Sequence, residues 1–348
     1  MKKTLQLAVV GCGYWGPNLV RNFRLVPDCA MRVVCDRDEK RLEEVKSLFP
    51  DVEVTTDFSR VLGNKAIDAV AVATPVQHHY EQARALLDAG KHVLLEKPMA
   101  ASAAACEDLC RRAARRGLTL MVDHTFLYSA PVRKMKEIVD GGDIGELRYI
   151  AARRLNLGLF QSDINVTWDL APHDLSIILY IMGKAPHALN CHGANSIAGH
   201  IEHVSNMSLF FPQGEYATVH NSWLDPKKVR EMTVVGSRRM IVYDDLEPQK
   251  KLTIYDARVE RPPHYNSFAE FHYSYHYGDM YSPYIKQDEP LKVVCNHFVE
   301  SIRTGATPLT DGRHGCELVR ILEASTDSLR RDGARVMIHR RHKRKVHS

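Results

Sequence analysis

A short glycine-rich segment limits what this chain can fold into more than any other feature. Gly11-Cys12-Gly13-Tyr14-Trp15-Gly16 fits the pattern G-x-G-x-x-G. It stands between an expected strand, Leu5 to Gly11, and an expected helix, Pro17 to Leu25, where proline is tolerated in the first turn. The glycines permit a tight turn and a close backbone approach to a pyrophosphate, which the helix N-terminus attracts. The segment predicts dinucleotide binding, with contacts from Gly11, Gly13, Tyr14, Trp15 and Gly16.

An acidic residue ends the next expected strand, Met31 to Asp36. Asp36 can accept hydrogen bonds from both ribose hydroxyls of an adenosine, and its charge would repel a 2′-phosphate. The predicted cofactor is therefore NAD rather than NADP. Arg37 leaves alternatives open, because it can stack on adenine, accommodate a phosphate if Asp36 turns aside, or simply lie solvated at the strand end.

The following residues alternate short apolar runs with helical stretches. This alternation is typical of a parallel sheet with helices on both faces. Further strands are expected over Ala69 to Ala73, His92 to Glu96 and Leu118 to Asp123, with helices over Glu81 to Ala89 and Ala103 to Arg116. The sequence predicts an α/β, doubly wound Rossmann domain over residues 1–123.

After Asp123 the pattern changes to long alternating strands, which indicates a largely antiparallel sheet with one face covered. Helices are expected over Pro131 to Val139, Pro172 to Met182, Leu291 to Thr304 and Gly315 to Arg331, and strands over Gly145 to Leu155, Val204 to Phe211, Glu215 to Trp223, Arg230 to Val235, Arg239 to Tyr243 and Lys251 to Asp256, with hairpin-like turns between the later strands. We predict an α+β domain with a large open-faced sheet over 124–338, whose last helices can pack back on the first domain.

Composition excludes several classes of protein. The length of 348 residues suits two domains, and 45% hydrophobic with 26% charged residues is ordinary globular composition. The formal charge of +5 equals the five basic residues of the tail 339–348, so the body is neutral. We therefore predict neither a nucleic-acid partner nor a membrane partner. The tail either binds an anionic surface or is a solvated extension.

The cysteines and the N-terminus bear on location. Eight cysteines occur without a C-x-x-C pair, and we interpret them as reduced thiols of a cytoplasmic protein. The apolar run before Cys12 imitates a lipoprotein signal, but it is shorter than the roughly 7 to 15 apolar residues such a signal needs. No stretch reaches the roughly 20 apolar residues of a membrane span.

Further motifs carry a family resemblance. These are Ala73-Thr74-Pro75 with His79, then Ala89-Gly90-Lys91-His92-Val93 running into Glu96-Lys97-Pro98, and Trp168-Asp169-Leu170-Ala171-Pro172-His173-Asp174. With the glycine motif they resemble the glucose-fructose oxidoreductase, inositol dehydrogenase and rhizopine-catabolism (Gfo/Idh/MocA) dehydrogenases, over nearly the whole chain. The resemblance implies catalytic roles for Lys97, Asp169 and His173, and we expect cofactor contacts from Thr74, Pro75, His79, Glu96 and Lys97. Thr74 and Pro75 end an expected strand, where open sheets of this type bind ligands, and His79 either lines the same crevice or caps the following helix.

The spacing of Asp169 and His173 is chemically sensible by itself. Residues four apart share one face of a helix, although Pro172 is expected to restrict the pair to the first turn. An aspartate beside an imidazole can stabilise its protonated form, as a base accepting a hydroxyl proton requires. We predict that a hydride leaves a carbinol carbon for the nicotinamide while His173 or Lys97 takes the proton, the two residues converging over the reacting carbon. Which of them is the formal base stays open.

A subgroup resemblance suggests the substrate. His124 to Tyr128 and Asn156-Leu157-Gly158 resemble bacterial nucleotide-sugar 3-dehydrogenases. This resemblance implies oxidation of the 3-hydroxyl of a UDP-N-acetylhexosamine or its uronate before an aminotransferase acts, and the predicted substrate is UDP-N-acetylglucosamine. Predicted substrate-binding residues are His124, Tyr128, Arg153, Arg154, Asn156, Trp168 and Tyr277. The arginines can instead pair with protein groups, and His124 and Tyr128 can be interdomain packing. Alternative functions are an NADP-linked ketosugar reductase, an inositol dehydrogenase and a non-catalytic dinucleotide-binding sensor.

The stretch His264 to Tyr284 is rich in aromatic residues and histidines. Phe271, Tyr273, Tyr275 and Tyr277 alternate with polar residues, which predicts a strand with one aromatic face. This face either packs in an oligomer interface or stacks on uracil, and we expect a homodimer or homotetramer formed through the C-terminal sheet. The histidine spacing does not predict a metal site.

Overall fold

The computed structural model describes residues 4–158, 160–161, 164–197, 200–260 and 274–338. The chain divides into two compact units, Met1–Ser129 with Asp288–Val319, and Ala130–Gln287 with Arg320–Ser348. The sequence had suggested a first domain over 1–123 and last helices that can pack back on it. In the structure, residues 288–319 belong to the first unit. The basic tail and the aromatic positions 271 and 273 lie outside the described residues.

A six-stranded parallel sheet forms the first unit, in the order β3-β2-β1-β4-β5-β6. The strands are β1 (Leu5–Val10), β2 (Cys29–Cys35), β3 (Glu53–Thr55), β4 (Ala69–Val72), β5 (His92–Glu96) and β6 (Leu120–Asp123). Burial explains their apolar runs, because β4 and nearly all of β1 and β5 are enclosed. The doubly wound Rossmann prediction is confirmed.

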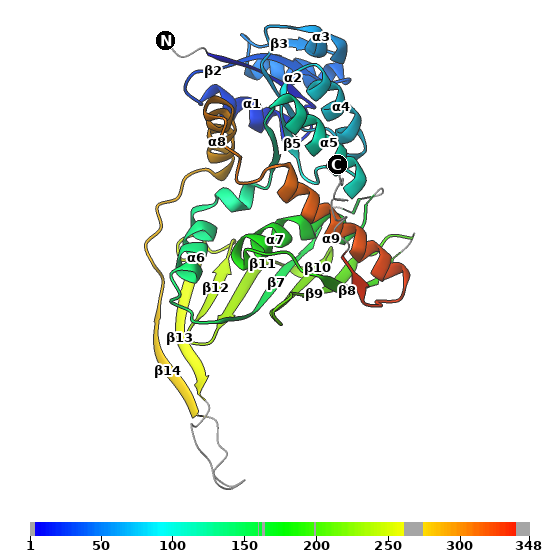
Figure 1. The fold of residues 1–348 in the computed structure, drawn as a ribbon. Coiled ribbons are helices and arrows are strands. Elements are labelled where there is room, and N and C mark those ends of the chain that lie inside the picture. The colour runs from blue at the N-terminus through cyan, green and yellow to red at the C-terminus, as the bar shows by residue number, and fades with distance from the viewer. Residues whose placement is uncertain (1–3, 159, 162–163, 198–199, 261–273, 339–348) are drawn as a thin grey trace, which may run out of the picture. The chain divides into compact units, whose positions relative to one another are not determined.

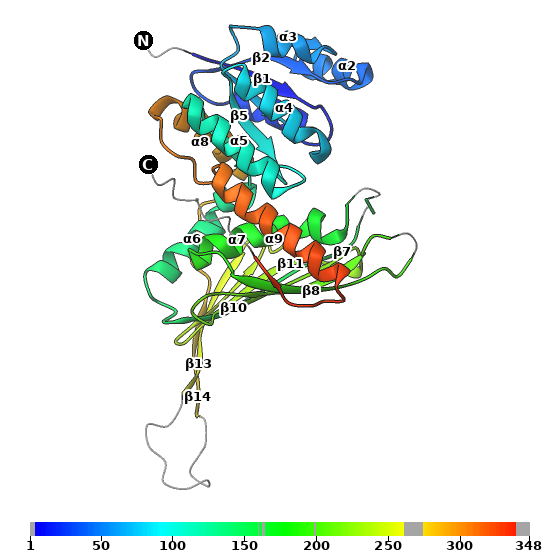
Figure 2. The ribbon, with the colours of Figure 1, turned by 45° about the vertical axis from the view of Figure 1, so that its right-hand side comes forward.

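Helices cover both faces of this sheet (Figures 1 and 2). They are α1 (Gly16–Arg24), α2 (Glu39–Leu48), α3 (Phe58–Gly63), α4 (Val76–Asp88), α5 (Ala103–Arg116), η1 (Thr125–Tyr128) and α8 (Pro290–Thr304). α8 packs on α1 and η1. The elements α2, β3 and α3 were not predicted. The prediction for α4 was wrong at its start: the helix begins at Val76, so His79 lies inside it and does not cap it.

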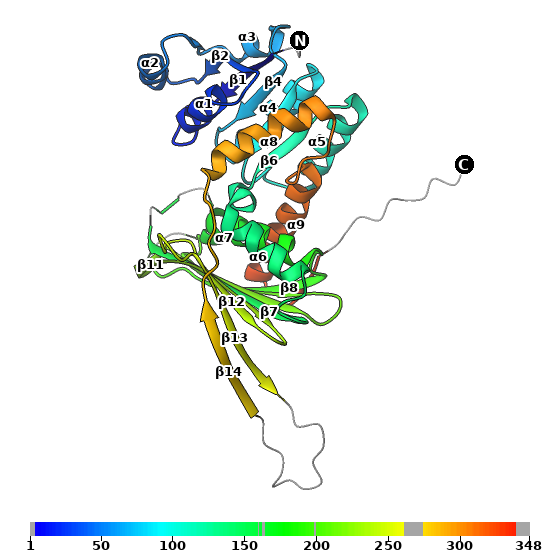
Figure 3. The same cartoon turned by 90° about the vertical axis from the view of Figure 1, so that its left-hand side faces the viewer.

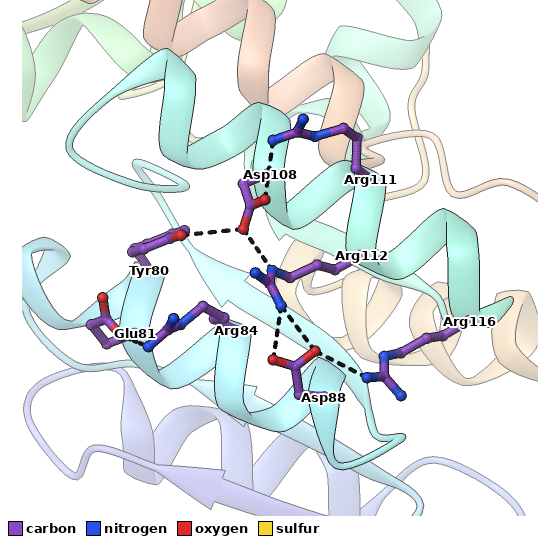
Figure 4. Close-up of polar contacts among 8 residues, drawn as sticks. All are labelled: Tyr80, Glu81, Arg84, Asp88, Asp108, Arg111, Arg112 and Arg116. Atoms are coloured by element: carbon purple, nitrogen blue, oxygen red, sulfur yellow. Dashed lines mark hydrogen bonds and ion pairs between the residues drawn. The ribbon is translucent and has the colours of Figure 1, made fainter.

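Helices α4 and α5 are joined by a polar network on their outer surface (Figure 4). Asp108 accepts hydrogen bonds from Tyr80 and Arg112, and Arg112 also reaches Asp88 at 2.8 Å. Arg116 donates to Asp88 as well. Surface ion pairs contribute little singly, so this network mainly fixes the register of two amphipathic helices.

A nine-stranded sheet forms the second unit, in the order β14-β13-β12-β11-β7-β10-β9-β8-β15. The strands are β7 (Leu147–Leu157), β8 (Ala188–Ala194), β9 (Val204–Phe210), β10 (Tyr216–Ser222), β11 (Leu224–Gly236), β12 (Met240–Asp244), β13 (Leu252–Glu260), β14 (Ser274–Tyr281) and β15 (Val336–Met337). Only the β7–β10 pair is parallel among these described strands. The predicted large, mostly antiparallel sheet is confirmed.

The connection after β10 departs from the predicted run of hairpins. β10 and β11 follow each other in sequence, but β7 lies between them and pairs with both. The cause lies outside the local pattern, because β7 comes from much earlier in the chain. β13 and β14 extend from the rest of the sheet as a two-stranded arm (Figures 1 and 3).

Helices α6 (Ala130–Asp140) and α7 (Val166–Met182) pack on one face of the nine-stranded sheet (Figure 3). α9 (Gly312–Arg330) begins in the first unit and ends in the second. The predicted start of α7 at Pro172 was wrong, since the helix begins at Val166 and continues through the proline. Asn165 caps the start of α7 by accepting a hydrogen bond from Trp168 N. The burial of apolar side chains along α7 compensates for the backbone hydrogen bond that Pro172 cannot make.

Within the described residues, none of the helices combines the length and apolar character needed to cross a lipid bilayer.

Candidate functional site

The glycine loop follows β1, and two of its three glycines have no room for a larger side chain. Gly11 has φ +98°, and a Cβ there would lie 2.6 Å from the carbonyl group of Ala73. A Cβ on Gly16 would lie 2.1 Å from the Gly11 oxygen. These two positions therefore require glycine, one for its backbone conformation and both for close approach of backbone to backbone.

The residues present fit a dinucleotide at the start of α1. Trp15 is the N-cap of this helix and provides no side-chain hydrogen bond, so the first amide groups are left for a ligand. Tyr14 and Trp15 are 81% and 41% exposed and contact each other edge to face. The glycine loop and this helix start would hold the pyrophosphate of NAD.

Asp36 lies buried immediately after β2 and accepts hydrogen bonds from the backbone amides of Cys12 and Asp38. The carboxylate therefore braces the glycine loop from the side where an adenosine ribose is expected. Arg37 is exposed. Arg41 on α2 lies beside this carboxylate, with its guanidinium 4.0 Å from Asp36 and 3.5 Å from Asp38. Sequence reasoning missed Arg41 because α2 itself was not predicted.

The end of β4 is tied to the segment after β5 by one histidine. The ring nitrogens of His79 lie 2.7 Å from the Thr74 carbonyl and 2.9 Å from the Pro98 carbonyl. Burial lowers the pKa of His79, and a neutral ring can donate to only one carbonyl at a time. Thr74 donates from its hydroxyl to Gln82, while Pro75 is exposed. His79 thus joins the predicted cofactor edge to the Lys97 segment.

Two acidic residues end neighbouring strands beside Lys97. Glu96 of β5 and Asp123 of β6 are register partners and are 9% and 2% exposed. Burial, followed by the charge of Asp123, raises the pKa of Glu96 well above its usual range. Burial also raises the pKa of Asp123 to about 6, against opposing effects of Thr125 and Lys97. Lys97 is half-buried and lies within electrostatic reach of both carboxyl groups.

His124 follows directly and is almost fully buried. Its two ring nitrogens have no hydrogen-bond partner among the described residues, and its ring lies 5.2 Å from that of His314. Burial lowers the pKa of both rings, to about 4 for His314. Tyr128 is buried with its hydroxyl 3.0 Å from Thr310 Oγ1. Nothing in the sequence near His314 indicated that it meets His124.

In the second unit, Asp169 and His173 lie four residues apart inside α7, which places them on one helical face. Both are half-buried. The indole nitrogen of Trp223 donates to Asp169 Oδ2 at 3.2 Å. Asp169 is thus oriented by a buried tryptophan just after β10, a partner that the sequence did not reveal.

The remaining predicted substrate residues have mixed surroundings. Arg154 forms a buried two-bond ion pair with Asp174, whereas the more exposed Arg153 pairs with Glu231 at 2.6 Å. Trp168 donates from its indole to Thr326. Asn156 is half-buried and Tyr277 is 82% exposed on β14. Their roles in substrate binding stay predictions.

An aromatic cluster that the sequence did not predict lies beside Asp169. Phe160, His203 and Trp223 contact one another with ring centroids 5.0 to 6.3 Å apart. His203 and Trp223 are buried, whereas Phe160 is 42% exposed. The cluster offers an aromatic surface to a ligand near the Asp169 carboxylate.

Comparison with known proteins identifies both parts of the chain. Residues 5–124 match the Gfo/Idh/MocA oxidoreductase family described as having an NAD-binding Rossmann fold, and residues 132–242 match the C-terminal domain of the same family. The prediction of an NAD-binding oxidoreductase is therefore confirmed.

Individual relatives are more distant. A scyllo-inositol 2-dehydrogenase (NADP(+)) of Bacillus subtilis (strain 168) is 27% identical, over 83% of this chain and 84% of that protein. A 1-carboxy-3-chloro-3,4-dihydroxycyclohexa-1,5-diene dehydrogenase of Comamonas testosteroni is 29% identical over 62% of this chain, and the match spans 57% of that protein.

The structure of UDP-N-acetylglucosamine 3-dehydrogenase from Acidithiobacillus ferrooxidans superposes with a TM-score of 0.77 at 21% identity, covering 94% of this chain and 98% of that one. That likeness shows a shared fold. The chain belongs to the Gfo/Idh/MocA family of NAD-binding oxidoreductases.

Proposed function

We propose that this chain is a cytoplasmic NAD-dependent dehydrogenase that oxidises a ring hydroxyl of a nucleotide sugar, namely the 3-hydroxyl of UDP-N-acetylglucosamine. The product would be a 3-keto sugar, a substrate suited to an aminotransferase. The observation that carries the proposal is the Asp169 carboxylate, held by Trp223 next to the exposed ring of Phe160. It combines an acid–base group with a surface on which a sugar or base ring can stack.

In this proposal, different residues of the chain transfer the proton, stabilise charge and hold the cofactor. The Asp169 charge stabilises a protonated His173, so that the imidazole can accept a hydroxyl proton. The role we propose for Lys97 is to stabilise negative charge that develops on a substrate oxygen, or to accept the proton itself. NAD, when bound, supplies the hydride acceptor. The glycine loop and Asp36 hold that cofactor.

A second candidate is an inositol or other polyol dehydrogenase that uses NADP. The Bacillus subtilis relative acts on scyllo-inositol with NADP(+) and matches most of the chain. Arg41 also favours this reading, since its guanidinium near Asp36 partly offsets the repulsion that Asp36 would exert on a 2′-phosphate.

One assay separates the candidates. Purified protein is incubated with NAD or NADP against UDP-N-acetylglucosamine, its uronate and myo-inositol, and the absorbance of the reduced nicotinamide is followed. We expect turnover with NAD and UDP-N-acetylglucosamine. Tight NAD binding without turnover of any alcohol would instead indicate a sensor and contradict the proposal.

Variants then test the residue roles. Lys97→Ala and His173→Ala should each lower kcat by about 10²- to 10⁴-fold, the usual size of acid–base contributions, while the Kd for NAD stays within about twofold. Phe160→Leu should raise the KM for UDP-N-acetylglucosamine about tenfold, since stacking on an aromatic ring contributes about 1 to 3 kcal/mol. Lys134→Ala, a surface change on α6, is the matched control. Equal loss of NAD binding would assign Lys97 to the cofactor site.

We also propose a homodimer or homotetramer formed through the nine-stranded sheet. The support is the exposure of two tyrosines on separate strands of this sheet: Tyr149 on β7 is 42% exposed and Tyr275 on β14 is 64% exposed. Sedimentation velocity should give a mass of two or four chains, and Tyr149→Asp should shift it toward one chain. A wild-type monomer at micromolar concentration would contradict this proposal.

A further inference from the structure

Two buried carboxyl groups lie side by side next to Lys97 in the first unit. Glu96 ends β5 and Asp123 ends β6, and they are register partners in a parallel strand pair. Such partners project their side chains to the same face of a sheet. Both groups therefore occupy one small region that is almost closed to water, with exposed fractions of 9% and 2%.

Hydrogen bonds satisfy this pair only in part. Asp123 Oδ1 accepts a hydrogen bond from the Thr125 hydroxyl at 2.7 Å, and Glu96 Oε2 accepts one from the Lys97 amide at 3.3 Å. Glu96 Oε1 is buried with no partner among the residues that the structure describes. An ionised carboxylate left in that state is costly, so a proton on Glu96 is favoured.

Among the described residues, the titratable groups linked electrostatically to this pair, directly or through Lys97 and His124, include one thiol, two imidazoles and the Lys97 ammonium. Burial keeps the pKa of the Cys295 thiol on α8 well above its usual range and that of His124 well below. Burial also lowers the pKa of His314 on α9 to about 4. Lys97 is the cation whose charge acts on both carboxyl groups. One lysine balances one carboxylate, which leaves the other carboxyl group to carry a proton.

We propose that Glu96 and Asp123 share one proton in the resting protein, beside a protonated Lys97, and that Asp123 takes up a proton from Lys97 so that the neutral amine can remove one from the substrate. This inference rests on the proposed oxidation of a hydroxyl group. It gives Lys97 a defined partner, and it makes Asp123 a positioning residue that acts through Lys97.

The step balances with the groups present. An N–H bond of the Lys97 ammonium breaks and an O–H bond forms on Asp123, which leaves a neutral Lys97 amine. The hydroxyl O–H bond of the substrate then breaks and an N–H bond forms on this amine, while bound NAD, the cofactor of the family, would accept the hydride that leaves the carbinol carbon with its electron pair. The pair passes from one proton to two, and the extra proton later returns to solvent.

Two measurements test this in the full chain. Infrared spectroscopy in light and heavy water detects a protonated carboxyl group in the protein alone, and kcat is measured against pH with NAD and UDP-N-acetylglucosamine. The variants are Glu96→Gln, Asp123→Asn and Asp123→Glu. Asp108→Asn, in the surface network of α4 and α5, is the matched control.

We expect a protonated-carboxyl band at pH 7 in the wild type that Glu96→Gln removes and Asp108→Asn retains. Asp123→Asn should lower kcat at pH 7 by about 10- to 100-fold, within the range of general acid–base effects, and alter the pH profile. The KM for NAD should stay within about twofold, and Asp123→Glu should recover most of kcat.

Two results would overturn the inference. One is the absence of the band at pH 7, which would mean that both carboxyl groups are ionised. The other is an Asp123→Asn protein with the kcat and pH profile of the wild type. A wild type that oxidises none of the alcohols would refute the proposed function instead, and the infrared band would still decide whether the pair shares a proton.

Discussion

The buried carboxyl group of Asp123 should lower the free energy of unfolding at neutral pH, compared with an uncharged side chain in the same place. Burial raises its pKa from 3.8 to about 6. The folded state therefore binds the proton more tightly than the unfolded state, and the stability that this contributes is present at low pH and lost as pH rises through 6. A shift of about two units corresponds to about 3 kcal/mol. Above pH 7 the full amount acts against folding.

Asp123→Asn removes the charge and keeps an oxygen that can accept from Thr125. We expect the free energy of unfolding of the variant to exceed that of the wild type by about 3 kcal/mol at pH 8 and by less than about 1 kcal/mol at pH 4, from the same linkage relation. Urea titrations at these two pH values measure the difference.

Asp57 serves as a control, because its contribution to stability should change with pH in the opposite direction. Asp57 caps α3, and hydrogen bonds from Ser59 lower its pKa, so it stabilises the fold above its unfolded pKa and loses this effect as pH falls. Asp57→Asn should therefore lower stability at neutral pH. An Asp123→Asn protein that is less stable than the wild type at pH 8, or a difference that does not change with pH, would refute the reasoning.

Three further outcomes are expected. Asp174→Asn, which leaves Arg154 buried without its carboxylate, should lower the free energy of unfolding by about 3 to 5 kcal/mol, and Asp174→Leu with Arg154→Met should recover most of it in the same urea titration. Gly11→Ala should abolish NAD binding in calorimetry, because its Cβ would overlap the Ala73 carbonyl, whereas Gly63→Ala, with open space around it, should bind normally; equal affinities would contradict the loop geometry. Burial raises the pKa of Cys12 and Cys191 to about 12, so a disulfide reagent at pH 8 should leave both thiols unmodified in the native protein and react with all eight in urea, as peptide mapping would show.

Local signals explain which elements could be predicted. The limits of β5 and α5 were predicted to the residue. For α5, Ser102 caps the N-terminus, Gly117 ends the helix in a left-handed conformation, and the buried positions recur at helical spacing. α2 was missed because only Leu42 and Val45 are buried in a strongly charged segment. An apolar pattern that sparse does not distinguish a helix from a loop.

The residues of the candidate site likewise fall into two groups, those that local sequence predicts and those that depend on contacts between distant segments. The glycine loop and Asp36 follow from one contiguous segment, whose spacing carries their chemistry. The pairing of Glu96 with Asp123 depends on strand register, and the contact of His124 with His314 depends on a helix nearly two hundred residues away. Trp223 likewise meets Asp169 only because β10 lies beneath α7. Nothing in the local sequence encodes such meetings.

The error at Pro172 has a consequence for the chemistry. Proline in a helix interior removes one backbone hydrogen bond, and this local cost led to the expectation that α7 starts there. The burial of apolar side chains along α7, including Ala171 and Leu175, offsets that cost. Asp169 and His173 therefore share one continuous helix instead of straddling its end. Their separation is then set by helical geometry, with Trp223 orienting the carboxylate, so the spacing of the proposed acid–base pair does not depend on a loop.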